Sequence, residues 1–257
     1  MKVTPVPCLS DNYAYLLICE ETGQAGVVDP SEAAPVLAAL KKASVEPVAI
    51  LNTHHHWDHI GGNQELLSRY PGLSVYGHKS DKGRIDGQTH FLETGDRFTL
   101  GKMEVAVLHN PGHTTGGISY VVEDGVFTGE TLFAAGCGRL FEGTPEMMVH
   151  SLRKVLGSLP EATRVYFGHE YTEANLRFAA SVEPDNADVT SRLAEVQDLR
   201  SQGKYTTPST LAAEWRTNPF LRVDSAGIQA TVKKNDPGND LSPAQVLGVV
   251  RELKNRF

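Results

Sequence analysis

The chain has 257 residues, of which 40% are hydrophobic and 21% charged, and these values exclude wholesale disorder, a collagen repeat and a coiled coil. No apolar run approaches the roughly 20 residues that cross a bilayer, and the formal net charge of −7 gives no electrostatic support for nucleic-acid binding. Three cysteines form no disulfide framework and no basic-then-apolar leader is visible, so we expect a cytoplasmic protein with reduced thiols.

The first two thirds of the chain predict a mixed domain of strands and helices. Short apolar runs bounded by Gly, Asp and Asn indicate strands, and the Glu-Asp-Gly turn at 123–125 indicates a hairpin. The expected strands are Tyr13–Cys19, Gly26–Asp29, Val48–Leu51, Leu73–Tyr76, Met103–Leu108, Ile118–Val122, Val126–Thr128 and Arg164–Phe167. The expected helices are Glu32–Ala43 after a Ser31 cap, Gly62–Tyr70, and Pro145–Leu159 after a Thr144 cap.

The remainder of the chain predicts a small helical domain. Amphipathic patterns indicate helices at Glu173–Val182, Ala187–Gln202 and Pro243–Asn255. The stretch 203–241 is rich in Thr, Pro, Asn and Gly and predicts loops. The formal net charge of −7 also arises entirely from residues 1–170, because basic and acidic residues balance in the rest of the chain. We therefore place the domains at 1–172 and 173–257.

Four of the ten histidines fall within six positions, and this cluster predicts a metal site. The segment Thr53–His59 reads Thr-His-His-His-Trp-Asp-His and connects an expected strand to an expected helix. Imidazole and carboxylate are ligands that suit zinc, iron and manganese. In an extended segment, the side chains of His54 and His56 would face the same side and could bind one metal. Asp58 and His59, which follow, could then bind a second metal. The spacing favours two metals about 4 Å apart.

Two isolated histidines fit the same hypothesis. His113 follows the strand expected at 103–108, and His169 follows the strand expected at 164–167. Each stands next to a glycine at a strand end. Each of these histidines alone would be interpreted as an ordinary loop residue. Together with the cluster at 54–59, both are candidate metal ligands.

The segments THHHWDH, PGHT, TGETLF, GCGRLFEG and GHEY, in this order, resemble the metallo-β-lactamase superfamily and, within it, the glyoxalase II family of hydroxyacylglutathione hydrolases. The resemblance covers nearly the whole chain. It implies an α+β fold, namely an αββα sandwich followed by a C-terminal α-helical domain that helps to bind glutathione.

The resemblance also implies a site with two divalent metal ions, zinc first and iron or manganese as alternatives. His54, His56 and His113 would hold one metal, and Asp58, His59 and His169 the other. The family has an aspartate that bridges both, whereas this chain has Glu130, whose carboxylate reaches roughly 1.5 Å further. Three outcomes stay open: a bridge through loop adjustment, a ligand to one metal only, or the loss of a metal.

The activity implied is hydrolysis of S-D-lactoylglutathione to glutathione and D-lactate, the second step of methylglyoxal detoxification. A metal-bound hydroxide would attack the thioester, with Asp58 orienting it as well as ligating. Cys137 is expected to be a packed residue and not a nucleophile. The matching substrate-contact positions are Arg139, Phe141, Tyr171, Arg251 and Lys254.

The sequence motifs are compatible with two further functions. One is an iron-dependent persulfide dioxygenase of the same superfamily, and another is a glutathione-conjugate binder whose catalysis Glu130 impairs. Lactonases, β-lactamases and nucleases share the histidine motif, but the helical C-terminal segment argues against them. We expect a monomer that acts on a glutathione thioester without membrane or nucleic-acid partners.

Overall fold

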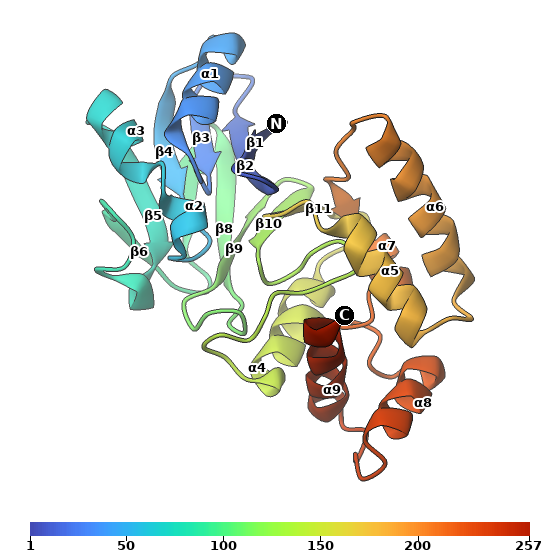
Figure 1. Ribbon diagram of the computed structural model, residues 1–257. Coiled ribbons are helices and arrows are strands. Elements are labelled where there is room, and N and C mark those ends of the chain that lie inside the picture. Colours follow the sequence, from blue (N-terminus) through green and yellow to red (C-terminus); the bar gives the residue numbers. More distant parts are fainter. The chain divides into compact units, whose positions relative to one another are not determined.

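The computed structural model describes residues 1–257, and the chain forms two compact units. The first unit comprises Met1–His109 and Gly116–Gly129, and the second comprises Asn110–Thr115 and Glu130–Phe257. Figure 1 labels the helices and strands in chain order. The expected boundary near residue 172 stays a prediction.

The first unit contains a six-stranded sheet whose strands follow chain order. Its first three strands are antiparallel neighbours, and its third to sixth strands run parallel. Every residue of the second and third strands is buried, as expected for strands covered on both faces. The strands are β1 (Lys2–Cys8), β2 (Asn12–Ile18), β3 (Ala25–Val28), β4 (Pro47–Leu51), β5 (Ser74–His78) and β6 (His90–Leu92).

The first unit also contains four antiparallel strands in the order β10-β9-β8-β7. The expected hairpin at 123–125 is confirmed, and Glu123 adopts a left-handed φ of 50° in its turn. The strands are β7 (Arg97–Leu100), β8 (Met103–His109), β9 (Ile118–Val122) and β10 (Gly125–Gly129).

Aromatic residues connect the two sets of strands. The Tyr120 hydroxyl donates to the carbonyl oxygen of Asn52 at 2.8 Å, and the Tyr15 ring meets the Phe127 ring edge-on at 5.5 Å between centroids. Burial raises the pKa of Tyr120 well above its usual value, so its hydroxyl remains a donor. Because Asn52 follows β4, this contact also supports the start of the histidine loop.

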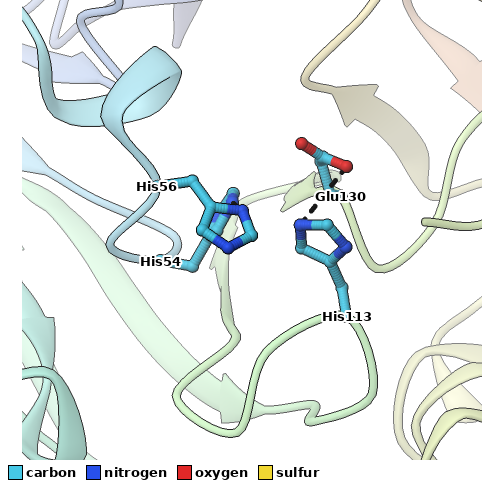
Figure 2. Close-up of side chains that lie close together, drawn as sticks. All are labelled: His54, His56, His113 and Glu130. Carbon is cyan, nitrogen blue, oxygen red and sulfur yellow. Dashed lines mark hydrogen bonds and ion pairs between the residues drawn. The ribbon is translucent and has the colours of Figure 1, made fainter. Parts of the chain in front are cut away.

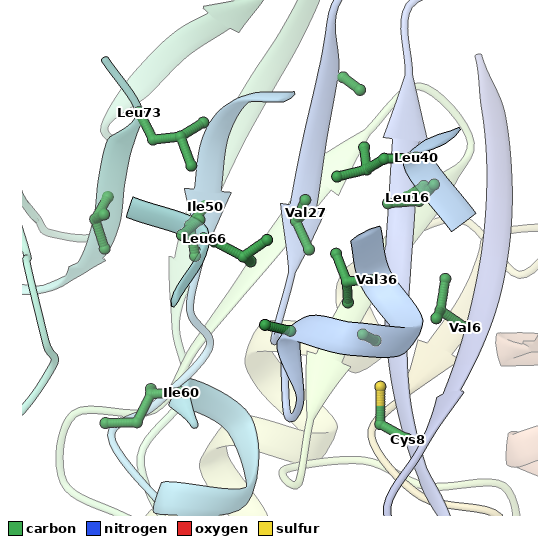
Figure 3. Packing of buried hydrophobic residues seen from close by; sticks show 14 of the residues in the cluster. Val6, Cys8, Leu16, Val27, Val36, Leu40, Ile50, Ile60, Leu66 and Leu73 are labelled. Atoms are coloured by element: carbon green, nitrogen blue, oxygen red, sulfur yellow. The ribbon is translucent and has the colours of Figure 1, made fainter. Parts of the chain in front are cut away.

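Helices α1 and α3 pack on the first sheet and close the core of the first unit. Figure 3 shows Val36 and Leu40 of α1 and Leu66 of α3 among side chains of the strands. All three are at most 1% exposed, and each such burial contributes about 1.5–3 kcal/mol. The helical segments of this unit are α1 (Ala33–Ala43), α2 (Trp57–Ile60), α3 (Asn63–Arg69) and a 3₁₀ turn, η1 (Lys79–Asp81).

The second unit is mainly helical, with a short antiparallel strand pair. Helix α5 packs on α6, and α9 packs on α4 and α8. A small apolar core includes Leu176, Ala179 and Val189. The elements are α4 (Pro145–His150), β11 (Arg164–Phe167), α5 (Thr172–Val182), α6 (Ala187–Ser201), β12 (Ser209–Thr210), α7 (Leu211–Thr217), α8 (Ala226–Asn235) and α9 (Pro243–Arg256).

The expectation of loops throughout 203–241 is wrong, because β12, α7 and α8 lie there. Helices this short are marginal in isolation and depend on tertiary packing. Leu211, Ile228 and Val232 are fully buried and supply that packing. The abundant Thr, Pro, Asn and Gly instead mark the helix ends, as where the Thr210 side chain accepts from the Ala213 amide at 3.2 Å.

Three smaller differences concern the ends and continuity of elements. Glu32, and not Ser31, is the residue that precedes α1, and its φ of −139° is extended. The segment expected as one helix at 145–159 is capped by Thr144 as predicted. It continues after α4 as a π turn, η2 (Ser151–Val155), and a 3₁₀ turn, η3 (Leu156–Ser158). Strands β1, β6 and β7 are not among the expected strands; β1 contains two prolines, which an edge strand tolerates.

None of the helices is long and apolar enough to serve as a membrane span.

Candidate metal centre

The histidine cluster follows β4 and leads into α2. Because β3 and β4 are parallel, their carboxyl ends meet at one edge of the sheet, which places Asp29 beside the cluster. Helix α2 approaches the segment after Asp29 closely: a Cβ on Gly61 would lie 2.6 Å from the Ser31 carbonyl oxygen. The glycine after the motif therefore permits this packing.

Asp29 fixes the orientation of His59. Its carboxylate accepts from the Thr53 amide and from the Thr53 hydroxyl, both at 2.7 Å, and lies 3.0 Å from His59 Nδ1. An ionised carboxylate only accepts, so the His59 proton is on Nδ1 and the lone pair is on Nε2. That Nε2 lies 3.7 Å from Asp58 Oδ2, so two potential ligand atoms face each other.

His54 is oriented through the same carboxylate. Thr53 donates its hydroxyl hydrogen to Asp29, so its oxygen accepts from His54 Nδ1 at 3.1 Å. The lone pair of His54 is then on Nε2, which lies 3.1 Å from His56 Nδ1. Asn12 orients Asp58 from the other side, because its side-chain amide donates to Asp58 Oδ2 at 3.1 Å. Such outer contacts fix the tautomer and direction of metal ligands.

The second unit brings His113, Glu130 and His169 together. Glu130 Oε2 lies 3.3 Å from His113 Nε2, and Glu130 Oε1 lies 3.2 Å from His169 Nε2. His113 Nδ1 donates to the Arg139 carbonyl oxygen at 2.8 Å, so its lone pair is on Nε2. Each oxygen of Glu130 therefore faces a different imidazole. Figure 2 shows the His113–Glu130 contact, and it also draws His54 and His56 of the first unit.

The donor set suits a divalent metal. All seven side chains predicted as ligands offer an imidazole nitrogen or a carboxylate oxygen. Ligand atoms about 2.1 Å from a tetrahedral ion lie roughly 3.4 Å from one another. The separations within each unit, from 3.1 Å for His54–His56 to 3.7 Å for Asp58–His59, are near that value. The spacing of these side chains therefore suits metal binding, and the outer nitrogens of His54, His59 and His113 already have partners.

Two aromatic residues predicted to contact substrate lie against histidines that are candidate metal ligands. The Tyr171 ring stacks on His169 with centroids 4.8 Å apart, and the Phe141 ring meets His113 edge-on at 5.3 Å. Phe141 is 62% exposed, and the Arg139 side chain is exposed as well. These three residues can meet a ligand that approaches the second unit.

Arg251 and Lys254 occupy different environments on α9. Arg251 is buried, donates to the Cys137 carbonyl oxygen at 2.6 Å and lies over the Phe220 ring. Lys254 is partly buried, with its amine 5.2 Å from the centroids of Phe178 and Phe257. Burial, together with the charge of Arg251, lowers the pKa of Lys254 to about 8. Lys254 is therefore the more accessible cation of the two.

Cys137 is buried, and burial raises the pKa of its thiol to about 11. A thiol that stays protonated is a poor nucleophile. The interpretation of Cys137 as a packed residue agrees with this environment.

Asp29, Thr53 and Asn12 are not among the functional residues predicted from the sequence. The position of Asp29 in the sequence could have indicated its role. A carboxylate at the end of a buried strand can form hydrogen bonds with the imidazoles of a histidine loop that follows the neighbouring strand. The role of the Arg139 backbone carbonyl has no sequence signal, because any residue supplies that oxygen.

Comparisons with known proteins agree with this site. Residues 11–169 match the family model of the metallo-beta-lactamase superfamily, and residues 170–257 match that of the hydroxyacylglutathione hydrolase C-terminus. A hydroxyacylglutathione hydrolase of a Synechococcus species is 50% identical, and one of a Synechocystis species is 48% identical; each alignment covers 100% of both chains. A solved structure of TTHA1623 in a di-iron-bound form is 28% identical with a TM-score of 0.62, and covers 85% of this chain and 100% of that one.

These matches confirm the predicted fold class, an α+β metallo-β-lactamase fold with a helical C-terminal region. The histidine motif alone identifies only the superfamily, whereas the sequence identity over the full length identifies the family within it. The chain belongs to the hydroxyacylglutathione hydrolase family within the metallo-β-lactamase superfamily.

Proposed function

We infer that this chain is a thioester hydrolase that converts an S-(2-hydroxyacyl)glutathione to glutathione and a 2-hydroxy acid. The observation that carries the inference is the match to hydroxyacylglutathione hydrolases over the whole chain, including the helical region at 170–257. A relationship limited to the histidine motif would leave lactonases, nucleases and dioxygenases equally open.

We propose two divalent metal ions per chain, with zinc the first candidate and iron or manganese the alternatives. In this proposal His54, His56 and His113 hold one ion, Asp58, His59 and His169 hold the other, and Glu130 bridges them. Support comes from the two oxygens of Glu130, which face His113 and His169 separately. The di-iron form of TTHA1623 supports two ions of this kind in the same fold.

Bound divalent ions lower the pKa of water and polarise a carbonyl oxygen. The carboxylate of Asp58, held by Asn12 at 3.1 Å, orients the attacking water and accepts its proton. The water oxygen forms a bond to the thioester carbon, the carbon–sulfur bond breaks, and sulfur leaves with the electron pair as the glutathione thiolate.

The proposed substrate site uses Arg139, Arg251 and Lys254 as cations for the two carboxylates of glutathione. Phe141 and Tyr171 supply apolar surface beside the ligand histidines. D-Lactoyl is the proposed acyl group, which would place the reaction second in methylglyoxal detoxification. We further propose a cytoplasmic monomer.

The test combines metal analysis of the purified protein with hydrolysis of S-D-lactoylglutathione. We expect about two ions per chain and rapid turnover. The Glu130→Asp variant should not exceed the wild type, because the glutamate oxygens already reach both histidines.

One iron per chain without thioester hydrolysis, in wild type and Glu130→Asp alike, would contradict the hydrolase and favour the dioxygenase. Fewer than two ions with weak turnover, both restored by Glu130→Asp, would overturn the proposed glutamate bridge but keep the hydrolase.

A further inference from the structure

A tight turn follows Glu130 in the second unit. The amide of Phe133 donates to the Gly136 carbonyl at 3.0 Å, and the Gly136 amide donates back at 3.2 Å. Before this turn comes Glu130, and after it comes Arg139, whose carbonyl holds His113. We call residues 133–136 the ligand turn.

The two sides of the ligand turn are directly connected to the metal ligands. The amide of Gly138 donates to the Glu130 carbonyl oxygen at 2.9 Å. A Cβ on Gly138 would lie 2.3 Å from that oxygen and 2.8 Å from His113 Nδ1. A displacement of the ligand turn would therefore reach both His113 and Glu130.

Side chains from helices hold the backbone of the ligand turn. Glu214 of α7 accepts from the Ala135 amide at 2.7 Å, and Asn175 of α5 donates to the Ala134 carbonyl at 3.0 Å. Asn218, at the end of α7, donates to the carbonyls of Phe133 and Gly136 at 3.1 and 3.0 Å. Glu214 also accepts from Asn218 at 3.0 Å, so it organises this second contact as well.

Ala135 shows why the turn needs an external support. Its φ of 53° lies in the left-handed region, which costs a residue with a side chain about 1 kcal/mol. The backbone amide of this strained residue donates its hydrogen bond to Glu214. The carboxylate thus stabilises a backbone conformation that the local sequence does not favour.

Glu214 is a fully buried carboxylate, and its own partners keep it in one orientation. Arg192 donates to Oε1 at 2.7 Å, Ser209 donates to the same oxygen, and Ala135 and Asn218 share Oε2. Buried ion pairs contribute little stability compared with apolar residues of equal volume. Their hydrogen bonds are directional, however, and here one of them ends at Ala135 in the ligand turn, while another holds Asn218, which itself donates to the turn.

We propose that Glu214 is a positioning residue for the metal centre, which acts through Asn218 and the ligand turn to orient His113 and Glu130. The proposal rests on the proposed function only in taking these two residues as metal ligands. The helical region thereby acts on the metal centre as well as on the substrate.

Glu183 offers a matched control. It is a buried glutamate that accepts from Arg222 at 2.7 Å and also from Ser225 and Asn186, so its partners are of the same types as those of Glu214. None of these partners contacts the ligand turn in the hydrogen bonds of the structure. Glu183→Gln therefore reproduces the loss of a buried ion pair without the proposed positioning role.

The experiment compares Glu214→Gln with Glu183→Gln in the full chain. Zinc affinity is measured by competition with a chromophoric chelator, and the His113 Nδ1–H resonance is measured in metal-free protein and assigned by its loss in His113→Ala. We expect Glu214→Gln to lower zinc affinity about 10- to 100-fold and to shift or broaden the resonance. Glu183→Gln should leave both unchanged, even if both variants lose thermal stability equally.

Unchanged affinity and resonance in folded Glu214→Gln, or equal changes in Glu183→Gln, would overturn the proposal. If Glu214→Gln does not fold, Asn218→Ser decides by the same two readouts, since it retains the Glu214–Arg192 pair. A wild-type protein that takes up no zinc, iron or manganese would contradict the proposed function instead, while the resonance would still report on positioning.

Discussion

Asp29 shows how one side chain can direct several others. It accepts from Thr53 and His59, and through Thr53 it also orients His54. Histidine ligates through a nitrogen that carries no proton, so the choice of tautomer decides which atom is available. Asp29 and the Arg139 carbonyl make that choice for three of the proposed ligands, His54, His59 and His113. The pre-oriented donors reduce the reorganisation that metal binding requires.

His59 distinguishes the two proposed ions. It is assigned to one ion only, so His59→Ala should remove one of about two ions per chain and lower turnover by roughly 10- to 100-fold. Elemental analysis and S-D-lactoylglutathione hydrolysis measure the two effects. The exposed His150, on α4, provides His150→Ala as a control with full metal content. Loss of both ions, or of neither, in His59→Ala would count against the assignment.

At the scale of elements, helix α9 contributes two cations of different accessibility. Arg251 is engaged with the backbone of Cys137, whereas Lys254 is partly buried among aromatic rings. The charged form of Lys254 is destabilised by burial and by Arg251, which is why its pKa falls to about 8. A binding anion would restore the favourable environment for that charge.

The pKa of Lys254 predicts how substrate binding depends on pH. Below about pH 8 the amine is protonated and ready for a carboxylate; above it, binding must first take up a proton, so KM should rise by up to tenfold per pH unit. Measuring KM for S-D-lactoylglutathione between pH 7 and 9.5 tests this. Lys254→Arg, whose charge does not titrate in this range, should flatten the rise. A wild-type KM that is constant up to pH 9.5 would show that Lys254 does not bind the substrate.

At the scale of the whole molecule, metal binding and folding are coupled. The seven proposed ligands are spread from His54 to His169 along the chain, so only the folded chain can bring them together. Ions that bind the folded state alone stabilise it, by about 4 kcal/mol at 1,000 times the dissociation constant.

Removing the metal should therefore lower the melting temperature. For a protein of this size we expect a decrease of roughly 10 °C after chelation, reversed by added zinc. Differential scanning calorimetry of metal-loaded and chelated protein measures it, and His59→Ala should show a smaller decrease. Identical melting temperatures would indicate that the ligands do not bind a metal in the folded state.

Features that depend on local spacing and residue type could be predicted from the amino-acid sequence. The histidine cluster, the hairpin at 123–125, the Thr144 cap and most of the principal strands and helices follow from patterns within a few residues. The seven metal-ligand candidates and the family resemblance followed from motifs of this kind. Short motifs predict such features correctly because residues that are neighbours in the chain are also neighbours in the folded protein.

Features that depend on partners distant in the chain could not be predicted from the sequence and are visible only in the folded protein. Asp29 orients His59 across 30 positions, and Glu214 holds Ala135 across 79. Helices α7 and α8 form because their apolar residues are buried by other elements, which a weak local pattern does not reveal. Backbone carbonyls that orient proposed ligands, such as that of Arg139, cannot be recognised from the sequence, because every residue type has one. Metal-ligand candidates could therefore be read from the chain, whereas their orientation depends on contacts that only folding creates.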